Sequence, residues 1–260
     1  YRQKLRHNMP EATLVFSDVK AVLELFKVLS TFNDEVPVKI TRREVFSAIM
    51  DHSRVSYIEL RIPAKSFESV EVKHGGIAVI PAKALIDVLR GGGEKVILEF
   101  HRPTAKKDAE LIVKLVNDGR SRRYKVNLIC PDDIQEEFLQ GLKLRLRFMF
   151  SIEVDAKVLL SDLKELRRFS DSLKLIGNED GLTLATRDYD GQIEISIHYG
   201  PKEEWSTLVK GRKTKHEASY GIEYLLSVIN PKLAPTYRIS FTRNKPVSYT
   251  HLTLPTTERV

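Results

Sequence analysis

The spacing of apolar residues predicts two long amphipathic helices. In residues 18–32 and again in residues 155–169, apolar side chains recur every three or four positions, which places them on one helix face. Asp18 and Asp155 stand at the start of these segments, where a carboxylate can accept hydrogen bonds from unpaired backbone N–H groups. We therefore expect equivalent helices in two halves of the chain.

Shorter elements surround each of these helices. Shorter helices are predicted at 81–90, beginning at Pro81, and at 220–229. Runs rich in β-branched residues predict strands at 13–16, 36–41, 45–50, 55–62, 69–72, 95–101, 109–117, 122–129, 145–152, 172–178, 182–187, 192–199 and 237–242. Asp180-Gly181 and Asp190-Gly191 predict tight hairpins. The second half thus repeats the order of the first, which predicts an α+β fold with two similar domains joined by an acidic connector.

The composition narrows the class of protein. The 260 residues are 42% apolar and 30% charged, which is typical of a globular chain with one large domain or two small ones. The single cysteine, Cys130, cannot form an intramolecular disulfide, which favours a reducing compartment. The sequence has no apolar run of about 18 residues and no apolar core of a signal peptide near Tyr1. We expect a cytoplasmic protein without a membrane partner.

The net charge of +7 and the pI of about 9.3 favour a polyanionic partner. Arg2, Lys4 and Arg6 precede Met9, so the placement of the charges matters more than their sum. The most informative cations lie in or beside the four predicted helices: Lys20, Lys27, Lys83, Arg90, Lys157, Lys164 and Lys232. Surface helices ordinarily carry lysine for solubility, but recurrence in both halves favours a strip that contacts duplex DNA phosphates without sequence preference.

Motifs for catalysis or cofactor binding do not stand out in the sequence. It lacks a phosphate-binding Gly-x4-Gly-Lys-Ser/Thr loop, a dinucleotide-binding glycine motif and a nucleophile elbow, and its seven histidines are scattered. The segment 188–191 resembles the opening of a calcium loop but lacks the later ligands, so a hairpin is the better interpretation. A nuclease using Asp188 and Asp190 is an alternative for which no further spaced carboxylate is evident. We expect no cofactor and no metal.

The order of elements and several motifs resemble the proliferating cell nuclear antigen (PCNA) sliding clamps. The segment Met50-Asp51-His52-Ser53-Arg54-Val55-Ser56 resembles the Met-Asp-x-Ser-x-Val turn of that family, and residues 175–182 resemble its counterpart in the second domain. Residues 64–68, 150–163 and 220–225 support the match. The resemblance extends from about Thr13 to Val247, and the sequence looks more archaeal than eukaryotic.

The resemblance implies a DNA polymerase processivity factor without catalytic activity. It implies a ring of three subunits, each with two domains, with antiparallel sheets outside and four helices lining the inner face around duplex DNA. The inner-face residues carried over are the seven cations named above. Edge strands of neighbouring subunits would pair, here 122–128 and 192–199. The alternative is one subunit of a heterotrimeric or checkpoint-type clamp that acts mainly as a protein-interaction platform.

The resemblance also implies a pocket for a short peptide motif borne by DNA polymerase, the clamp loader, flap endonuclease and DNA ligase. An interdomain connecting loop would contribute to this pocket. The implied pocket residues are Met50, Val55, Tyr57, Phe138, Leu139 and Pro246. For Met50 and Val55, ordinary core packing is an equally simple interpretation.

The implied domain boundaries leave two terminal segments outside the family pattern. The N-terminal domain would span 9–130, the connecting loop 131–144 and the C-terminal domain 145–247. Residues 1–8 and 248–260 are interpreted as non-native extensions, because the pattern expected of the family's closing strand stops at Ser248. The alternation of Tyr249, His251 and Thr253 is nevertheless compatible with a strand in the vacant position.

Overall fold

The computed structural model describes residues 9–50, 57–105, 107–131, 148–241 and 248–251. Tyr57 apart, contacts divide the described residues into two compact units, one within 9–131 and the other within 148–251. The connecting loop predicted at 131–144 lies almost wholly outside the described residues. Its boundaries, and those of the two predicted domains, therefore stay a prediction.

The first unit contains strands and two α-helices. Its elements are β1 (Glu11–Phe16), α2 (Val19–Phe32), β2 (Glu35–Ile40), β3 (Glu44–Met50), β4 (Tyr57–Pro63), the 3-10 turn η1 (Ala64–Ser66), β5 (Ser69–His74), β6 (Gly76–Pro81), α3 (Ala82–Leu89), β7 (Lys95–His101), β8 (Glu110–Asn117) and β9 (Arg120–Asn127). They form a five-stranded sheet in the order β5-β1-β7-β8-β9 and a four-stranded sheet in the order β4-β3-β2-β6. A bridge between Val79 and Ile129 connects β6 to the segment after β9.

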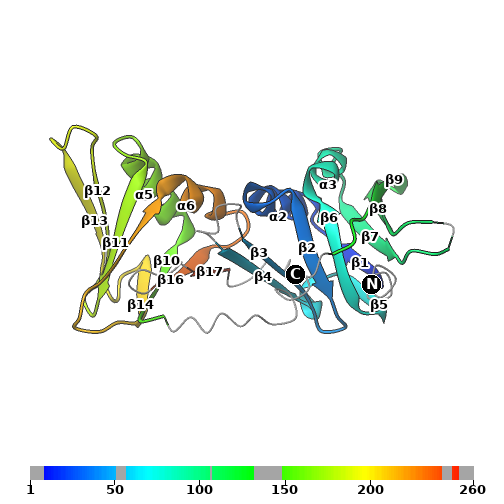
Figure 1. Cartoon of the computed structure of the whole chain (residues 1–260), viewed down its shortest axis with the longest axis horizontal. Helices are drawn as coiled ribbons and strands as arrows, with labels where there is room; N and C mark the ends of the chain where they lie inside the picture. Colours follow the sequence, from blue (N-terminus) through cyan, green and yellow to red (C-terminus); the bar gives the residue numbers. More distant parts are fainter. Residues whose placement is uncertain (1–8, 51–56, 106, 132–147, 242–247, 252–260) are drawn as a thin grey trace. The chain divides into compact units, whose positions relative to one another are not determined.

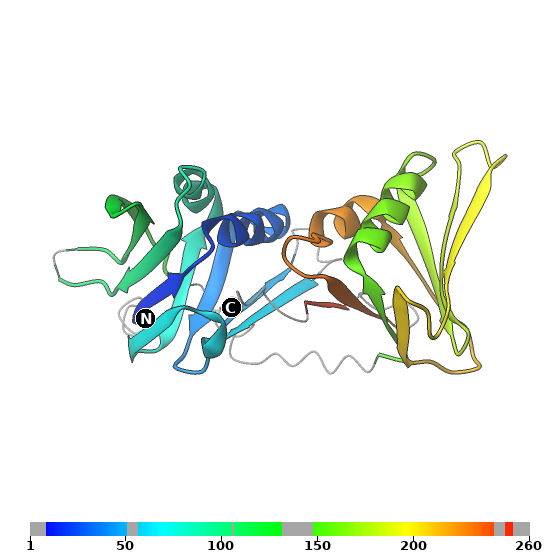
Figure 2. The same ribbon diagram turned by 180° about the vertical axis from the view of Figure 1, so that it is seen from behind.

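The helices of the first unit lie side by side against its sheets (Figures 1 and 2). The carboxylate of Asp18 accepts a hydrogen bond of 2.9 Å from the backbone N–H of Ala21, as the sequence predicts for a helix cap. One face of α2 buries Val22, Phe26 and Leu29, which fixes the opposite face toward solvent. The helix surface that carries the candidate cations is therefore set by core packing.

The second unit repeats this plan. Its elements are β10 (Phe150–Asp155), α5 (Ala156–Arg167), β11 (Ser172–Asn178), β12 (Gly181–Arg187), β13 (Glu194–Tyr199), β14 (Ser206–Lys210), β15 (His216–Gly221), α6 (Ile222–Val228), β16 (Thr236–Phe241) and β17 (Ser248–His251). The sheets have the orders β13-β12-β11-β15 and β14-β10-β16-β17. As in the first unit, the two α-helices, α5 and α6, contact each other on one side of the sheets (Figure 1).

Antiparallel pairing builds the sheets of the second unit. Glu179 and Asp180 form the turn of the β11–β12 hairpin, and Gly181, the first residue of β12, lies opposite Asn178. Residues 188–193 connect β12 to β13, where Arg187 lies opposite Glu194. Both predicted hairpins are present, but only the β11–β12 hairpin has a tight turn, because residues 188–193 all lie between β12 and β13. The compatibility of the C-terminal segment with a strand is also confirmed, since β17 pairs with β16.

Several predicted bounds differ from those of the structure. The strand predicted at 145–152 runs instead from Phe150 to Asp155, because Asp155 both ends β10 and accepts hydrogen bonds that start α5. Pro81 is not the first residue of α3 but the last of β6, where it lies opposite Glu35. Strands β6, β14 and β15 are absent from the sequence prediction.

None of the helices in the described residues is long and apolar enough to cross a membrane.

Candidate nucleic-acid interface

Four candidate cations lie on or at the end of the helices of the first unit. Lys20 and Lys27 are two turns apart on α2, Lys83 lies on α3, and Arg90 follows the last residue of α3. All four reach solvent, with the side chain of Lys27 43% exposed. Because α2 and α3 contact each other, the structure places these cations on neighbouring helices.

Three of these four cations already contact a carboxylate. The Lys27 ammonium lies 2.8 Å from Glu24, the Lys83 ammonium lies 2.5 Å from Asp34, and the Arg90 guanidinium lies 2.9 Å from Asp87. In the described chain no carboxylate pairs with Lys20. Exposed ion pairs of this kind contribute about 0 to 1 kcal/mol, so a phosphate can replace the carboxylate at small cost.

Three further candidate cations lie in the second unit. Lys157 and Lys164 are exposed on α5, seven residues apart, and Lys232 is exposed beyond the end of α6. Their ammonium groups form no ion pair with any carboxylate of the described residues. The cations that need no rearrangement to meet a phosphate are therefore Lys20, Lys157, Lys164 and Lys232.

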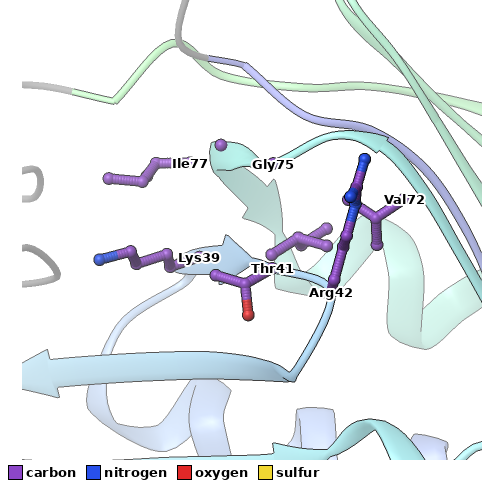
Figure 3. A pocket seen from close by; sticks show the side chains of 8 residues that line it. Lys39, Thr41, Arg42, Val72, Gly75 and Ile77 are labelled. Atoms are coloured by element: carbon purple, nitrogen blue, oxygen red, sulfur yellow. The ribbon is translucent and has the colours of Figure 1, made fainter.

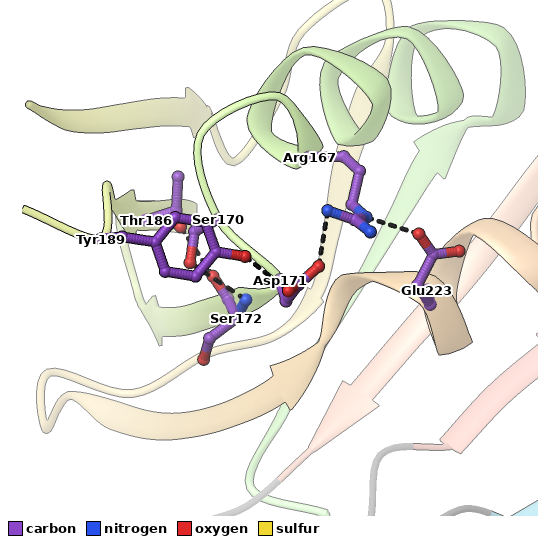
Figure 4. Close-up of polar contacts among 7 residues, drawn as sticks. All are labelled: Arg167, Ser170, Asp171, Ser172, Thr186, Tyr189 and Glu223. Carbon is purple, nitrogen blue, oxygen red and sulfur yellow. Dashed lines mark hydrogen bonds and ion pairs between the residues drawn. The ribbon is translucent and has the colours of Figure 1, made fainter.

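A network of side chains that the sequence analysis did not single out fixes the end of α5. Arg167 contacts Asp171 at 2.5 Å and also Glu223 in the first turn of α6, as Figure 4 shows. The hydroxyl of Tyr189 donates a 2.5 Å hydrogen bond to Asp171, which raises the pKa of Tyr189. The carboxylate of Glu223, hydrogen-bonded to the guanidinium, raises the pKa of Arg167. The network joins α5, α6 and the β12–β13 connection, and no periodicity in sequence signals it.

A second polar contact holds the edge strand β13 to α5. Tyr199, the last residue of β13, is only 1% exposed, and its hydroxyl donates a 2.6 Å hydrogen bond to Asp162 on α5. Burial, with a smaller contribution from the Asp162 carboxylate, raises the pKa of Tyr199 well above its ordinary value. The position of the edge strand is thus tied to the helix that carries Lys157 and Lys164.

Both strands predicted to lie at subunit edges do lie at sheet edges. β9 is the last strand of the five-stranded sheet of the first unit, and β13 is the first strand of its sheet in the second unit. An edge strand presents unpaired backbone N–H and C=O groups to which a further strand can pair. The pairing of these edges between subunits stays a prediction.

The predicted peptide pocket lies outside the described residues. Val55, Phe138, Leu139 and Pro246 fall in segments that are not described. Met50 ends β3 and Tyr57 begins β4, but their side chains are likewise outside the description. The pocket therefore stays a prediction.

The nuclease alternative gains no support at Asp188 and Asp190. The Asp188 carboxylate accepts a 2.9 Å hydrogen bond from the backbone N–H of Ile193, which stabilises the hairpin connection. Within the described ranges, no group of three or more His, Cys, Asp or Glu side chains could hold a metal ion. The Asp188 carboxylate is therefore accounted for by its contact within the turn.

A shallow cavity of about 370 Å³ lies in the first unit, between the β2–β3 and β5–β6 connections (Figure 3). Its charged lining residues are Lys39 and Arg42, whose side chains extend in different directions. The lining contains no carboxylate, thiol or imidazole that could act with them in acid–base chemistry. The cavity therefore offers no paired general acid and base.

Comparisons with known proteins give one consistent result. The chain is 26% identical over 217 residues to a DNA polymerase sliding clamp of Thermococcus gammatolerans, covering 83% of this chain and 82% of the relative. It is 25% identical, with the same coverage, to a DNA polymerase sliding clamp of Pyrococcus abyssi. No family model matches the chain.

Solved structures show the same relationship at the level of the fold. PCNA from Thermococcus kodakaraensis superposes with a TM-score of 0.77 at 20% identity, covering 93% of this chain and 94% of that chain. The PCNA2–PCNA3 complex from Sulfolobus tokodaii gives a TM-score of 0.75 at 19% identity, with the same coverage. Two similar α+β units with antiparallel sheets and paired helices are thus the shared architecture.

Proposed function

From the premise that this chain is a PCNA-type sliding clamp in fold and sequence, we propose that it encircles duplex DNA as a DNA polymerase processivity factor. The predicted resemblance and the predicted α+β fold class are confirmed. The observation that carries the proposal is the sequence relationship to DNA polymerase sliding clamps over 83% of the chain. The fold match over 93% of the chain supports it independently.

The proposed action is topological and involves no reaction. A closed ring stays on DNA without a tight contact, and it raises the local concentration of any enzyme bound to it. DNA polymerase, the clamp loader, flap endonuclease and DNA ligase would bind through a short peptide motif. The pocket for that motif would contain Met50, Val55, Tyr57, Phe138, Leu139 and Pro246. The ring would act in the cytoplasm on the nucleoid, or in the nucleus of a eukaryotic cell.

The seven candidate cations would face the DNA from the helices. Lys20, Lys157, Lys164 and Lys232 are available without breaking an ion pair, whereas Lys27, Lys83 and Arg90 would exchange a carboxylate for a phosphate. Contacts of this kind go to phosphates, so the binding would be independent of base sequence. Weak, salt-sensitive contacts are compatible with a ring that slides.

Three copies would close the ring through strands β9 and β13. The exposed edges of these strands support this arrangement, because each lies at the end of its sheet. The alternative, one subunit of a heterotrimeric clamp, is not favoured: the two relatives described above are each named simply as DNA polymerase sliding clamp. Because a solved structure contains a complex of PCNA2 with PCNA3, the heterotrimeric alternative is tested as well.

The mass of the purified chain in solution tests the assembly. Size exclusion with light scattering should give about 89 kDa, three times the 29.8 kDa of one chain. A strictly monomeric chain at all concentrations would contradict a self-closing ring. Addition of a related clamp subunit that restored a trimer would then establish the heteromeric alternative.

Retention on circular DNA tests the function itself. The chain, loaded by an archaeal clamp loader onto a nicked plasmid, should stay with the plasmid through gel filtration in high salt. Cutting the plasmid once should release it, because a ring slides off a free end. Equal retention on circular and linear DNA would contradict encirclement.

Charge removal on α5 tests the proposed helical interface. In Lys157→Gln/Lys164→Gln, the slope of log K against log salt should fall by up to about 0.9 for each phosphate that the variant no longer neutralises. The matched control Arg42→Gln/Lys213→Gln removes the same charge from exposed turns and should leave the slope unchanged. Equal effects of the two variants would mean that only net charge matters.

A further inference from the structure

A run of glycines follows one of the candidate DNA-contacting cations. Helix α3 ends at Leu89, and residues 91–93, which are all glycine, come directly after Arg90. Glycine has more backbone freedom than any other residue, so such a run favours fraying of the last helical turn. The final carbonyl groups of a helix also have no partner within the helix. The position of Arg90 therefore depends on what holds the segment that follows it.

Arg122, on strand β9, holds two carbonyl groups of this segment. Its guanidinium Nη2 donates a hydrogen bond of 2.7 Å to the carbonyl of Gly91 and another of 2.7 Å to the carbonyl of Gly92. Bonds from a charged donor are stronger than bonds from a neutral one, and a positive charge is favourable beside a helix C-terminus. Because α3 and β9 are separate elements, Arg122 links the end of the helix to the sheet.

The backbone approaches this contact closely enough to explain its glycines. A Cβ at Gly91 would lie 3.3 Å from Nη1 of Arg122 and 3.4 Å from Leu115, which lies opposite Arg122 in the β8–β9 pairing. Gly92 has a φ of +66°, a left-handed conformation that glycine adopts without strain. The geometry thus favours glycine at both positions, and Arg122 restricts the freedom that the glycines introduce.

The last turn of α3 and the Arg122 contact share Gly91. The backbone N–H of Gly91 donates to the carbonyl of Val88 at 3.0 Å, while its own carbonyl accepts from Arg122. Arg90 lies within this turn, and its exposed guanidinium is 2.9 Å from Asp87. Loss of the Arg122 contact should therefore loosen the turn that presents Arg90 to solvent.

We propose that Arg122 is a positioning residue that fixes Arg90 for contact with a DNA phosphate. This inference rests on the proposed function and goes beyond it, because the cations assigned to the DNA surface include Arg90 but not Arg122. The guanidinium of Arg122 is engaged with backbone carbonyls and acts through the end of the helix. It contributes to the interface without contacting the nucleic acid.

Amide hydrogen exchange tests the contact itself. In Arg122→Met, exchange at the amides of Gly91 and Gly92 should accelerate at least about tenfold, because the two carbonyls lose their donor and the turn opens more often. Arg122→Lys should accelerate exchange by about threefold, since a lysine keeps the charge but replaces the planar fork with a point donor. Amides in the middle of α2 should exchange within about twofold of their unaltered rates in both variants.

Binding to duplex DNA tests the action on Arg90. Arg90→Gln should lower the slope of log K against log salt by up to about 0.9 for each phosphate that is no longer neutralised. Arg122→Lys removes no charge, yet it should lower the slope by at least half as much. The matched control Arg42→Lys makes the same exchange in the exposed β2–β3 turn and should leave the slope unchanged.

A double-mutant cycle separates positioning from general weakening. Adding Arg122→Lys to Arg90→Gln should lower the slope no further, because the group that Arg122 positions is already absent. An effect of Arg122 that did not pass through Arg90 would add to that of Arg90→Gln.

Three outcomes would overturn the inference: unchanged exchange in Arg122→Met, a slope for Arg122→Lys equal to that of the control, and additive effects in the cycle. Loss of folding in circular dichroism, or of assembly in light scattering, in Arg122→Lys would overturn it too, because Arg122 would then support the whole chain or its assembly. The proposed function stands in each case if the unaltered chain is retained on circular DNA. An unaltered chain that is not retained contradicts the function itself, so the two failures are distinguishable.

Discussion

Replacing Tyr199 with Phe should destabilise the second unit while leaving its packing intact. The ring is 1% exposed and stays in place, but its hydroxyl no longer donates to Asp162 over 2.6 Å. A hydrogen bond to a charged group contributes about 1.5 to 3 kcal/mol. Asp162 is only half-buried and can recover water, so we expect the lower value, about 1.5 kcal/mol. At about 2 to 4 °C for each kcal/mol in a chain of this size, the melting temperature should fall by about 3 to 6 °C.

The free energy of unfolding above pH 10 gives a second readout of the same contact. Burial raises the pKa of Tyr199 in the folded chain above the ordinary value of 10, so its contribution is present below pH 10 and is lost as pH rises further. Above pH 10 the unfolded chain has released a proton that the folded chain retains. The unaltered free energy of unfolding should fall there by about 1.4 kcal/mol per pH unit more steeply than in the variant.

Urea unfolding at a series of pH values measures both effects. Tyr124→Phe is a matched control, because Tyr124 on β9 lies half-buried with no hydroxyl partner in the described residues. It should change stability by less than about 0.5 kcal/mol. The reasoning is refuted if Tyr199→Phe matches this control at pH 7 and shows the same alkaline slope as the unaltered chain.

Three further outcomes follow from particular contacts. Gly177→Ala should lower the free energy of unfolding by about 1 to 3 kcal/mol, because its Cβ would lie 2.5 Å from the buried ring of Phe150. In calorimetry, the double variant Gly177→Ala/Phe150→Leu should lose less stability than the sum of the two single variants. His216→Leu should raise the free energy of unfolding by up to about 1 kcal/mol, because the buried Nε2 has no partner in the described residues. The midpoint of urea unfolding should rise accordingly, and a lower midpoint would contradict this. Tyr189→Phe should accelerate amide exchange in the hairpin connection by removing the bond to Asp171, and unchanged exchange would show that the connection is held by its own turn.

Predictions from sequence are most accurate where one local interaction determines an element. Asp18 and Asp155 cap α2 and α5 as expected, because an N-cap needs only a carboxylate beside free N–H groups. The turns at Asp180-Gly181 and Asp190-Gly191 are predictable for a similar reason. Asp118-Gly119 forms a turn with positive φ at both residues, whereas at the other two sites only the glycine has positive φ. Its dipeptide carries the same signal, although the sequence prediction does not include it.

The strands that the sequence prediction misses have patterns that only tertiary contacts resolve. β6 is buried at four successive positions, so it shows no alternation, and an apolar run of that length fits either a strand or part of a helix. β14 and β15 lie at sheet edges, where most side chains face solvent and the apolar signal fades. Their pairing partners are distant in sequence, and a local pattern does not contain them.

Sequence reasoning about the candidate interface finds the cations but does not show which of them form ion pairs. It places Lys27 and Lys164 on helices without distinguishing them, whereas the structure pairs Lys27 with Glu24 and leaves Lys164 without an ion pair in the described residues. Pairs that cross elements, such as Lys83 with Asp34, depend on the packed fold and have no sequence period. The Arg167 network is of the same kind.

The strand pairings also determine when the chain can fold during its synthesis. Leu14 in β1 pairs with Leu98 in β7, and Ile152 in β10 pairs with Ile239 in β16. At about 5 to 20 residues per second, the ribosome needs about 4 to 17 s to supply each later partner. During that interval β1 or β10 lacks one neighbour and can pair with another chain. Each half is therefore exposed to aggregation once per round of translation, and nascent-chain binding by chaperones would be most useful at these two moments.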